Sequence, residues 1–572
     1  MTRWSVLLTV AAMAVSTSAA AQSPVGDWAG VLEVGQVKLH IGVHVHEGSE
    51  GELTGTLDSP DQGVTGLLLA DISRQDDALS FTVPAINGRY AAKWDAASRS
   101  WKGQWSQGGP SASLDLTVGA PPAPPKPLPA DWRPPADAAI HQLIAERIAP
   151  REGEGIAVGV LDGRDRRIVT GGAVTPDTLF EIGSITKVFT ATILADMAAK
   201  GEVSLDDPAE KYLPAGAHMP ERNGRKITLR DLSMHRSGLP RVPDNMPMAD
   251  PEDPYSDYTE AQLLDFLSHY PLTRDIGSQW EYSNLGVGLL GYLLGRAAHK
   301  DYPTLLRERI TGPLGMHDTV LTLSTEQRKR FATPYDAYGR PTKPWKIPAL
   351  AGAGGIRSTA GDMLKFAAAV IDPRSPLAPA VKLELSELGP AIRTNVHQGL
   401  GWQIVDFGSG RRVLTHDGGT GGFRSTLALE PARQRAVVVL ANSGAEPSTT
   451  DMALHILIGS PVAPTPALPN TPPPRTAHTE MTLPAAELDR VIGRYDFGNG
   501  VIFEVTRAPD GLRAQRQGSV TGPSLPIFAE APLKFFWRAV DAAVTFTADE
   551  SGKVTGATFT QAGATLTGKR VD

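Results

Sequence analysis

The chain has 572 residues, of which 41% are hydrophobic and 20% are charged, so its composition is that of ordinary globular protein and its length suits roughly two to four domains. A formal net charge of -7 gives it no general attraction to polyanions, which argues against nucleic acid as a partner. The sequence contains no cysteine, which excludes disulfides, thiol catalysis, cysteine-ligated metals and a lipid-modified N-terminal cysteine.

The N-terminal segment has the composition of a secretory signal. Arg3 supplies a positive charge, residues 6–15 are apolar, and three alanines at 19–21 form a small-residue cleavage site before Gln22. The apolar run is shorter than the ~20 residues that a membrane span needs, so no stable membrane anchor is expected. Residues 1–21 are therefore predicted to be a signal peptide, and the mature protein is expected to be periplasmic or secreted.

Proline-rich segments divide the rest of the chain. Residues 119–135 and 461–475 favour extended, semi-rigid spacers over packed structure. They separate an N-terminal part at 24–118, a central part at 136–460 and a C-terminal part at 476–572.

The N-terminal part alternates apolar and polar residues between turns rich in Gly, Asp and Asn, which predicts a small antiparallel β-domain. In residues 39–46 the aliphatic side chains define one face of a strand, and His40, His44 and His46 lie on the other. A histidine cluster of this kind can bind zinc or nickel. The regular alternation favours solvated histidines instead, so no metal is expected.

The central part mixes helical and strand signals, and we expect the chemistry there. Residues 184–200 are predicted to form an amphipathic helix stopped by Gly201, and residues 436–440 a buried strand. Ser184 and Lys187 form a Ser-x-x-Lys motif at the start of the helix and therefore share one helix face. The lysine amine can then reach the serine hydroxyl, and the positive end of the helix favours negative charge on an attacking oxygen or an acyl oxyanion.

The Ser-x-x-Lys motif is a weak signal alone. A chain of this length and composition contains about one by chance, and Ser184 fits equally well as a helix N-cap followed by an exposed lysine. Two later segments strengthen this signal. Tyr282 and Asn284 stand at a loop-to-helix junction before an apolar helix, and His416 precedes a glycine-rich stretch in which glycines permit close backbone approach to a ligand.

In this order the Ser-x-x-Lys, Tyr-x-Asn and His-x-Gly motifs resemble those of the serine β-lactamase and penicillin-binding protein superfamily, in the branch that holds class C β-lactamases, family VIII esterases and D-aminopeptidases. Other segments of the central part also look like that branch: residues 205–208, 232–239, 312–316, 354–359 and 399–402. The resemblance implies an α+β fold, with an antiparallel five-stranded sheet flanked by helices, a helical subdomain, and the nucleophile at the N-terminus of a central helix.

The resemblance also implies an acyl-enzyme mechanism. Ser184 would attack a carbonyl carbon, Lys187 and Tyr282 would move its proton, and Asn284 would orient Lys187 and the substrate. The third motif is then formed by His416, Gly418 and Gly419, and the N–H groups of Ser184 and Gly419 would hold the oxyanion. No cofactor is implied.

The third motif departs from the pattern of many β-lactamases, which have Lys followed by Thr or Ser to receive the carboxylate of the antibiotic. Here the two positions are His416 and Asp417. A histidine is mostly neutral near pH 7, and an aspartate that faces the cleft disfavours a substrate carboxylate. The alternative is that Asp417 points away and caps a turn. Arg357 and Arg424 could bind a carboxylate, but loop arginines more often pair with a nearby acid, and neither is assigned a role.

The C-terminal part again shows short strands, at 501–505 and 543–547, which predicts a β-barrel or sandwich. It resembles the lipocalin-like accessory domains of this hydrolase branch. Phe535, Phe536 and Trp537 are either core residues or an apolar contact strip for substrate.

Three functions stay open. The first is an exported serine hydrolase acting through an acyl-enzyme on small esters, amides or D-amino-acid peptides. The second is a non-hydrolytic penicillin-binding or peptidoglycan-sensing protein, and the third is a β-lactamase or D,D-peptidase, which Asp417 disfavours. The expected partner is a small-molecule or peptide substrate, and the sequence carries no signal for an oligomeric state.

Overall fold

The structure is a computed structural model. It describes residues 23–34, 37–60, 64–107, 111–119, 128–129, 131–149, 151–389, 391–393, 395–408, 410–466, 468, 478–498, 501–508, 511–518, 524–538, 541–561 and 564–571. The predicted signal peptide and most of the two proline-rich segments lie outside these residues. Within them, no helix has both the length and the apolar character needed to cross a membrane.

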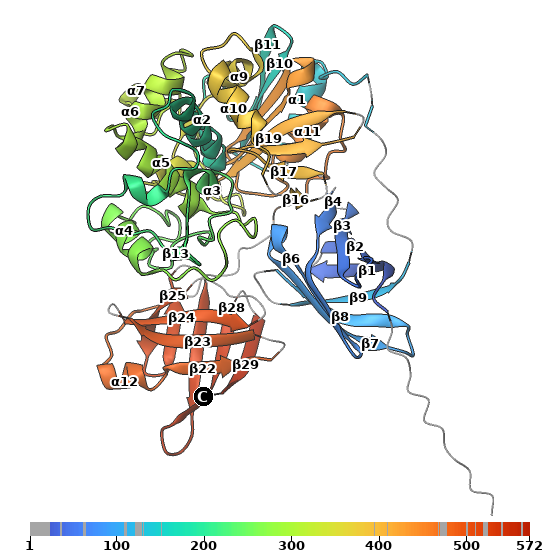
Figure 1. Cartoon of the computed structure of the whole chain (residues 1–572), viewed down its shortest axis with the longest axis vertical. Coiled ribbons are helices and arrows are strands. Elements are labelled where there is room, and N and C mark those ends of the chain that lie inside the picture. Colours follow the sequence, from blue (N-terminus) through green and yellow to red (C-terminus); the bar gives the residue numbers. More distant parts are fainter. Residues whose placement is uncertain are drawn as a thin grey trace, which may run out of the picture.

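The N-terminal part folds into one antiparallel sheet with the strand order β4-β3-β2-β1-β9-β8-β7-β6-β5 (Figure 1). The strands are β1 (Gly26–Val34), β2 (Val37–Glu47), β3 (Leu53–Ser59), β4 (Val64–Leu68), β5 (Ala70–Gln75), β6 (Ala78–Val83), β7 (Gly88–Asp95), β8 (Ser100–Ser106) and β9 (Ala112–Val118). Its core contains the buried aromatic residues Trp28, Tyr90 and Trp101.

The histidines of β2 lie opposite its buried aliphatic face, as the alternation predicts. His40 and His46 are exposed. His44 lies between two carboxylates, with its Nδ1 2.7 Å from Asp27 Oδ1 and its Nε2 3.4 Å from Asp58 Oδ2. Among the described residues no group of three His, Asp or Glu side chains is placed to hold a metal ion.

The central part contains an eight-stranded antiparallel sheet with the order β11-β10-β21-β20-β19-β18-β17-β16. Its strands are β10 (Gly155–Asp162), β11 (Asp165–Gly172), β16 (Ala391–Arg393), β17 (Val396–Gln398), β18 (Gln403–Asp406), β19 (Arg412–Gly419), β20 (Arg424–Glu430) and β21 (Arg435–Ala441). The predicted five strands correspond to β11, β10, β21, β20 and β19. The expectation of five was too low, because three short strands add to the edge at β19.

Helices cover both faces of this sheet. α1 (Asp137–Ile148) and α11 (Thr450–Ile458) pack on one face. The other face and the helical subdomain hold α2 (Thr186–Ala199), α3 (Leu229–Ser233), α4 (Glu260–His269), α5 (Asn284–Ala297), α6 (Tyr302–Leu306), α7 (Thr325–Lys329), α8 (Ala351–Gly354), α9 (Ala360–Ile371) and α10 (Ala378–Ser386). Two short antiparallel pairings join β12 (Phe180–Glu181) to β15 (Arg357–Ser358) and β13 (Glu221–Arg222) to β14 (Arg225–Lys226).

Helix α2 differs from its prediction. It is not amphipathic, since twelve of its fourteen residues are buried. The helix lies between the sheet and helices α5, α8 and α10, so apolar neighbours surround it. A helix that is apolar all round is one that a protein buries completely.

The C-terminal part is a closed barrel. Its strands are β22 (Gly493–Asp496), β23 (Val501–Ala508), β24 (Gly511–Gly518), β25 (Ser524–Ala531), β26 (Lys534–Trp537), β27 (Ala542–Ala548), β28 (Val554–Gln561) and β29 (Ala564–Arg570), preceded by the short helix α12 (Ala485–Asp489). Phe535, Phe536 and Trp537 are all buried, which favours their interpretation as core residues over an exposed contact strip.

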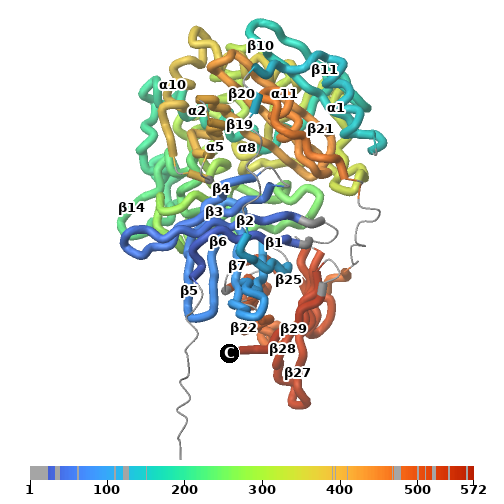
Figure 2. The backbone as a smooth tube through the Cα atoms, turned by 90° about the vertical axis from the view of Figure 1, so that its right-hand side faces the viewer, coloured from blue at the N-terminus to red at the C-terminus, as the bar shows by residue number. Residues whose placement is uncertain are grey.

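Both β-structures lie on the same side of the central part (Figures 1 and 2). Strand β4 lies beside β16 at the short-strand end of the sheet. Ala85, in the short 3-10 helix η2 (Pro84–Ile86), packs against the N-terminal core and also against a second cluster built on Ile392, Val396 and Val405. Trp280 of the central part packs against the same cluster, so η2 and the loop that carries Tyr282 share one group of apolar neighbours.

Candidate active site

Ser184 lies in the 3-10 turn η3 (Gly183–Ile185) directly before α2, and Ile185, not Ser184, is the N-cap of that helix. Gly183 has a φ of 50°, and a Cβ atom there would lie 2.7 Å from the backbone nitrogen of Gly419. Only glycine accepts both conditions. The Gly419 peptide is therefore brought against the residue that precedes Ser184.

Strands β19 and β20 are attached to the same turn. A Cβ atom at Gly418 would collide with the backbone oxygen of Ile182, so the strand can approach the turn only because this residue is glycine. Ser425 Oγ donates a hydrogen bond of 2.8 Å to that same oxygen. The two predicted glycines thus lie at the junction of the third motif with the nucleophile turn.

Lys187 is almost fully buried, with 1% of its surface exposed. Its Nζ lies 3.0 Å from Ser184 Oγ, 2.9 Å from Asn284 Oδ1 and 2.7 Å from the backbone oxygen of Ala353 in α8. Burial lowers the pKa of Lys187 well below its ordinary value, and the positive charge of Arg241 acts in the same direction. The amine is therefore biased toward its neutral form.

The three partners of Lys187 determine where its lone pair points. Both carbonyl oxygens, of Asn284 and Ala353, can only accept hydrogen bonds. A neutral amine has two N–H groups, and these two oxygens use both. The lone pair is then left for the hydroxyl of Ser184, which can donate. The contact set suits a lysine that removes the proton of Ser184.

Tyr282 also borders this group, and the hydroxyl of Ser184 acts to lower the pKa of its phenol. Its ring stacks on His235 at a centroid distance of 4.5 Å, and Lys187 Nζ lies 4.8 Å from its centroid. Burial raises the pKa of Tyr282 above its ordinary value of 10, so the phenol keeps its proton near neutral pH.

Asn284 is the first residue of α5, which Ser283 caps by accepting a hydrogen bond of 2.8 Å from the backbone N–H of Gly286. Asn284 Nδ2 donates to the hydroxyl of Tyr255 at 2.9 Å, and Asn284 Oδ1 accepts from Lys187. The two contacts together fix the orientation of the amide. Tyr255 was missed by the sequence analysis, because no motif marks it.

His416 is buried on β19, and its ring centroid lies 6.5 Å from that of Tyr282. Its Nδ1 lies 2.6 Å from the backbone oxygen of Asp417, which can only accept, so Nδ1 carries a proton. Burial lowers the pKa of His416, and the imidazole is therefore mostly neutral at pH 7. It supplies no fixed positive charge at this position.

Asp417 does not cap a turn. It lies inside β19, opposite Thr426, with an exposed side chain on the sheet face opposite to His416. Its negative charge nevertheless raises the pKa of Lys187 and of Tyr282.

The loop that carries Tyr282 is held by residues that sequence reasoning missed. His235 is buried with a φ of 56°, its backbone oxygen accepts from Glu281 N at 2.8 Å, and its Nδ1 accepts from Ser283 N at 3.1 Å. An imidazole that accepts through Nδ1 is neutral, and burial lowers its pKa accordingly. The sequence marked His235 only as part of the resemblance at 232–239.

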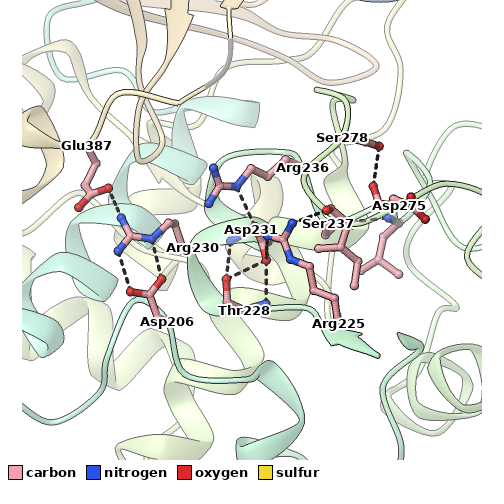
Figure 3. Close-up of polar contacts among 12 residues, drawn as sticks. Asp206, Arg225, Thr228, Arg230, Asp231, Arg236, Ser237, Asp275, Ser278 and Glu387 are labelled. Carbon is pink, nitrogen blue, oxygen red and sulfur yellow. Dashed lines mark hydrogen bonds and ion pairs between the residues drawn. The ribbon is translucent and has the colours of Figure 1, made fainter. Parts of the chain in front are cut away.

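Asp231 holds the loop that carries His235 in place through hydrogen bonds (Figure 3). The buried carboxylate accepts from Arg236 Nε at 2.7 Å and from a terminal nitrogen of Arg225 at 3.2 Å, and it closes a capping box with Thr228. The backbone oxygen of Arg236 in turn accepts from Gly277 N at 2.8 Å. Both loops beside Tyr282 are thus tied to one buried acid.

The two arginines left without a role have structural partners. Arg357 bonds the buried Glu181 at 3.1 Å and the backbone oxygen of Leu321 at 2.6 Å. Arg424 donates to the backbone oxygens of Thr420 and Phe423.

Comparison with known proteins agrees with the three motifs. A family model described as Beta-lactamase matches residues 140–459. The chain is 32% identical over 318 residues to the D-alanyl-D-alanine-carboxypeptidase/endopeptidase AmpH of Escherichia coli (strain K12), which covers 50% of this chain and 80% of that protein. It is 26% identical over 323 residues to a β-lactamase of Pseudomonas fluorescens, covering 50% and 86% of the two chains.

Among solved structures, a β-lactamase/D-alanine carboxypeptidase from Yersinia pestis complexed with citrate shares 29% sequence identity with this chain. The alignment has a TM-score of 0.47 and covers 54% of this chain and 92% of that one. The family match spans more than half of the chain, and it confirms the resemblance inferred from the motifs. This chain therefore belongs to the β-lactamase family, as a serine hydrolase of that family.

Proposed function

We propose that this protein hydrolyses small esters, amides or D-amino-acid peptides through an acyl-enzyme on Ser184. The observation that carries the proposal is the set of contacts around Lys187. A buried amine meets two oxygens that can only accept and one hydroxyl that can donate. This arrangement supports general-base activation of a serine.

The proposed reaction has two halves. In the first, Lys187 takes the proton of Ser184 while Oγ bonds to the substrate carbonyl carbon, and the N–H groups of Ser184 and Gly419 stabilise the oxyanion. Tyr282, which is protonated, gives a proton to the leaving group as its bond to carbon breaks, and it regains a proton from Lys187. In the second half, neutral Lys187 takes a proton from water as the water oxygen bonds to the acyl carbon, and that proton passes to Ser184 Oγ as the Oγ–carbon bond breaks, which releases the acid and restores the enzyme.

The charge of the third motif supports simple esters and amides over β-lactams. Neutral His416 and anionic Asp417 stand where many β-lactamases place groups that receive a carboxylate. A chromogenic cephalosporin hydrolysed as fast as a short-chain ester would favour the β-lactamase or D,D-peptidase alternative. An enzyme that is acylated but never turns over would favour the sensor alternative.

The composition of residues 1–21 supports export to the periplasm or the medium, with a small molecule or peptide as substrate. N-terminal sequencing of the protein from its native host checks this proposal. We expect the mature chain to begin at Gln22, and an intact N-terminus in the cytoplasmic fraction would contradict it.

The direct test compares the hydrolysis of p-nitrophenyl butyrate by wild type, Ser184→Ala and Ser278→Ala. Ser278 is an exposed loop serine whose hydroxyl donates to the backbone oxygen of Asp275, so it controls for the loss of a hydroxyl. We expect turnover to be lost only in Ser184→Ala. Equal rates in wild type and Ser184→Ala would contradict the proposal.

A further inference from the structure

Arg241 is held firmly beside the active site by its backbone. Its carbonyl oxygen accepts hydrogen bonds from Asn284 N at 2.9 Å and from Leu285 N at 3.1 Å. These are the first two residues of α5, so the same helix end positions Arg241 and the amide that orients Lys187. A residue bonded in this way keeps its place relative to the reacting groups.

The side chain of Arg241 reaches over the phenol that borders the nucleophile. Its guanidinium carbon lies 5.1 Å from the ring centroid of Tyr282, within the range of a cation–π contact. The residue is exposed, and its charge lowers the pKa of Lys187, His235 and Tyr282. The guanidinium therefore lies at the mouth of the site and close to its reactive nitrogen and oxygen atoms.

Among the described residues, no acid pairs with Arg241. In the part of the chain that the structure describes, its guanidinium forms neither a hydrogen bond nor an ion pair. Two acids of the flanking loops have other cationic neighbours: Glu281 pairs with Arg274, and Arg513 of the barrel lowers the pKa of Asp244. By contrast, Arg236 pairs with Asp231 and Arg357 pairs with Glu181.

We propose that Arg241 is the anion-recognition residue of this site and binds a carboxylate carried by the acyl part of the substrate. The proposal rests on the proposed function, because it names a substrate class for the same site. A guanidinium presents paired N–H donors that match a carboxylate, and an unpaired one needs no existing ion pair to be broken. On the β19 side, neutral His416 and anionic Asp417 offer a substrate carboxylate no cation, so Arg241 is the favoured partner for it.

The assignment departs from the pattern implied by the resemblance, in which the third motif receives the carboxylate. Here the third motif carries a neutral imidazole and an anion. The cation near the site is instead Arg241, in the loop before α5. Substrates with an anionic acyl group should therefore bind through Arg241 and not through β19.

The test compares two esters that have acyl chains of equal length, mono-p-nitrophenyl glutarate, which carries a carboxylate, and p-nitrophenyl valerate, which does not. The enzymes are wild type, Arg241→Gln, Arg241→Lys, and Arg424→Gln as a control. Arg424 is an arginine near β19 whose guanidinium is occupied by backbone oxygens. The measured quantity is the ratio of kcat/KM for glutarate to that for valerate.

We expect Arg241→Gln to lower this ratio by about tenfold or more, since a charge-assisted hydrogen bond to a carboxylate is lost, and to do so mainly through KM for glutarate. Arg241→Lys should keep part of the preference, and Arg424→Gln should leave the ratio unchanged. Raising the salt concentration should weaken glutarate binding in wild type more than in Arg241→Gln.

Two results would overturn the assignment. An unchanged ratio in Arg241→Gln shows that the guanidinium does not contact the carboxylate. Equal losses for both esters show that Arg241 acts on the chemistry of Lys187 and Tyr282 and not on substrate charge. If wild type hydrolyses neither ester, the proposed function itself has failed, and this result is separate from the other two.

Discussion

The two walls of the cleft are built in different ways. One wall is helix α2 with its preceding turn, where the partly buried Ser184 and the buried Lys187 lie one helical turn apart. The other wall consists of loops, residues 235–241 and 277–283, which carry Arg241 and Tyr282. The helix wall is shaped by local sequence and burial, whereas the loop wall is held by contacts from distant parts of the chain.

The difference separates two tasks. The helix wall is dry and neutral, which suits proton transfer at the nucleophile. The loop wall and the end of β19 are partly exposed and carry the two opposite charges of Arg241 and Asp417. We infer that chemistry depends mainly on the first wall and substrate choice mainly on the second. The following predictions test that division, beginning with the largest expected effect.

Substitution of Lys187 should lower kcat more than any other change described below. Lys187→Met removes the base, and Lys187→Arg keeps a cation that cannot lose its proton at accessible pH. Both should lower kcat by about 10³-fold, within the range for loss of a general base. The measurement is kcat on p-nitrophenyl butyrate. Near-normal turnover in Lys187→Arg would show that a neutral amine is not required.

The same lysine should set the acidic limb of the pH profile. Since burial lowers its pKa, kcat/KM of wild type should rise with pH through a value below 10.5 and then level off. A rise that begins only above that value would contradict a desolvated base.

Loss of the Tyr282 hydroxyl should lower kcat less than loss of the Lys187 amine does. Tyr282→Phe keeps the ring on His235 but removes the proposed proton donor, so we expect kcat to fall about 10²-fold. Tyr292→Phe is the matched control, because Tyr292 lies farther along α5 and its hydroxyl bonds Glu260 of α4. If the two variants lose activity equally, Tyr282 has no proton-transfer role.

The N-terminal sheet should affect the loop wall more weakly. Ala85 packs in the cluster that holds Trp280, and Trp280 Nε1 donates to the buried Gln398 at 3.1 Å. A large charged side chain in Ala85→Arg should displace that loop and lower kcat about tenfold, since small misplacements near a reacting group are costly. Ala97→Arg, at an exposed turn of the same sheet, should have no effect. Equal activities in the two variants would mean that the sheet does not position Tyr282.

The smallest effect on activity is expected for Glu384, which lies behind the helix wall. Its substitution should change the stability of the fold. Glu384 of α10 accepts a hydrogen bond of 2.9 Å from Thr192 of α2, and burial raises its pKa from 4.5 to about 8. The folded protein therefore holds a proton that the unfolded chain releases. Its stability contribution is complete below pH 4.5 and is lost as the pH rises to 8.

Glu384→Gln removes this titration. The fall in Tm of wild type between pH 6 and pH 9 should be smaller in the variant, as measured by thermal unfolding at both values. An identical fall in both proteins would show that Glu384 is ionised in the folded state.

The same division explains what could be predicted from sequence. Ser184 and Lys187 are three residues apart, and Tyr282 and Asn284 are two apart, so local patterns mark them. His235, Arg241 and Tyr255 reach the site through contacts between distant segments, which no local spacing encodes.

The fold shows a similar limit. Strand alternation identified both β-structures at the ends, because burial of one face has a period of two. The full burial of α2 and the three short strands beside β19 were missed, because both depend on what packs against the element and not on its own sequence.

Intact mass spectrometry of wild type, quenched during turnover of p-nitrophenyl butyrate, tests the central claim most directly. We predict a mass increase of one butyryl group, located by peptide mapping on Ser184, that disappears when the ester is exhausted. Continued turnover with no adduct on Ser184, or an adduct on another residue, would contradict the acyl-enzyme mechanism.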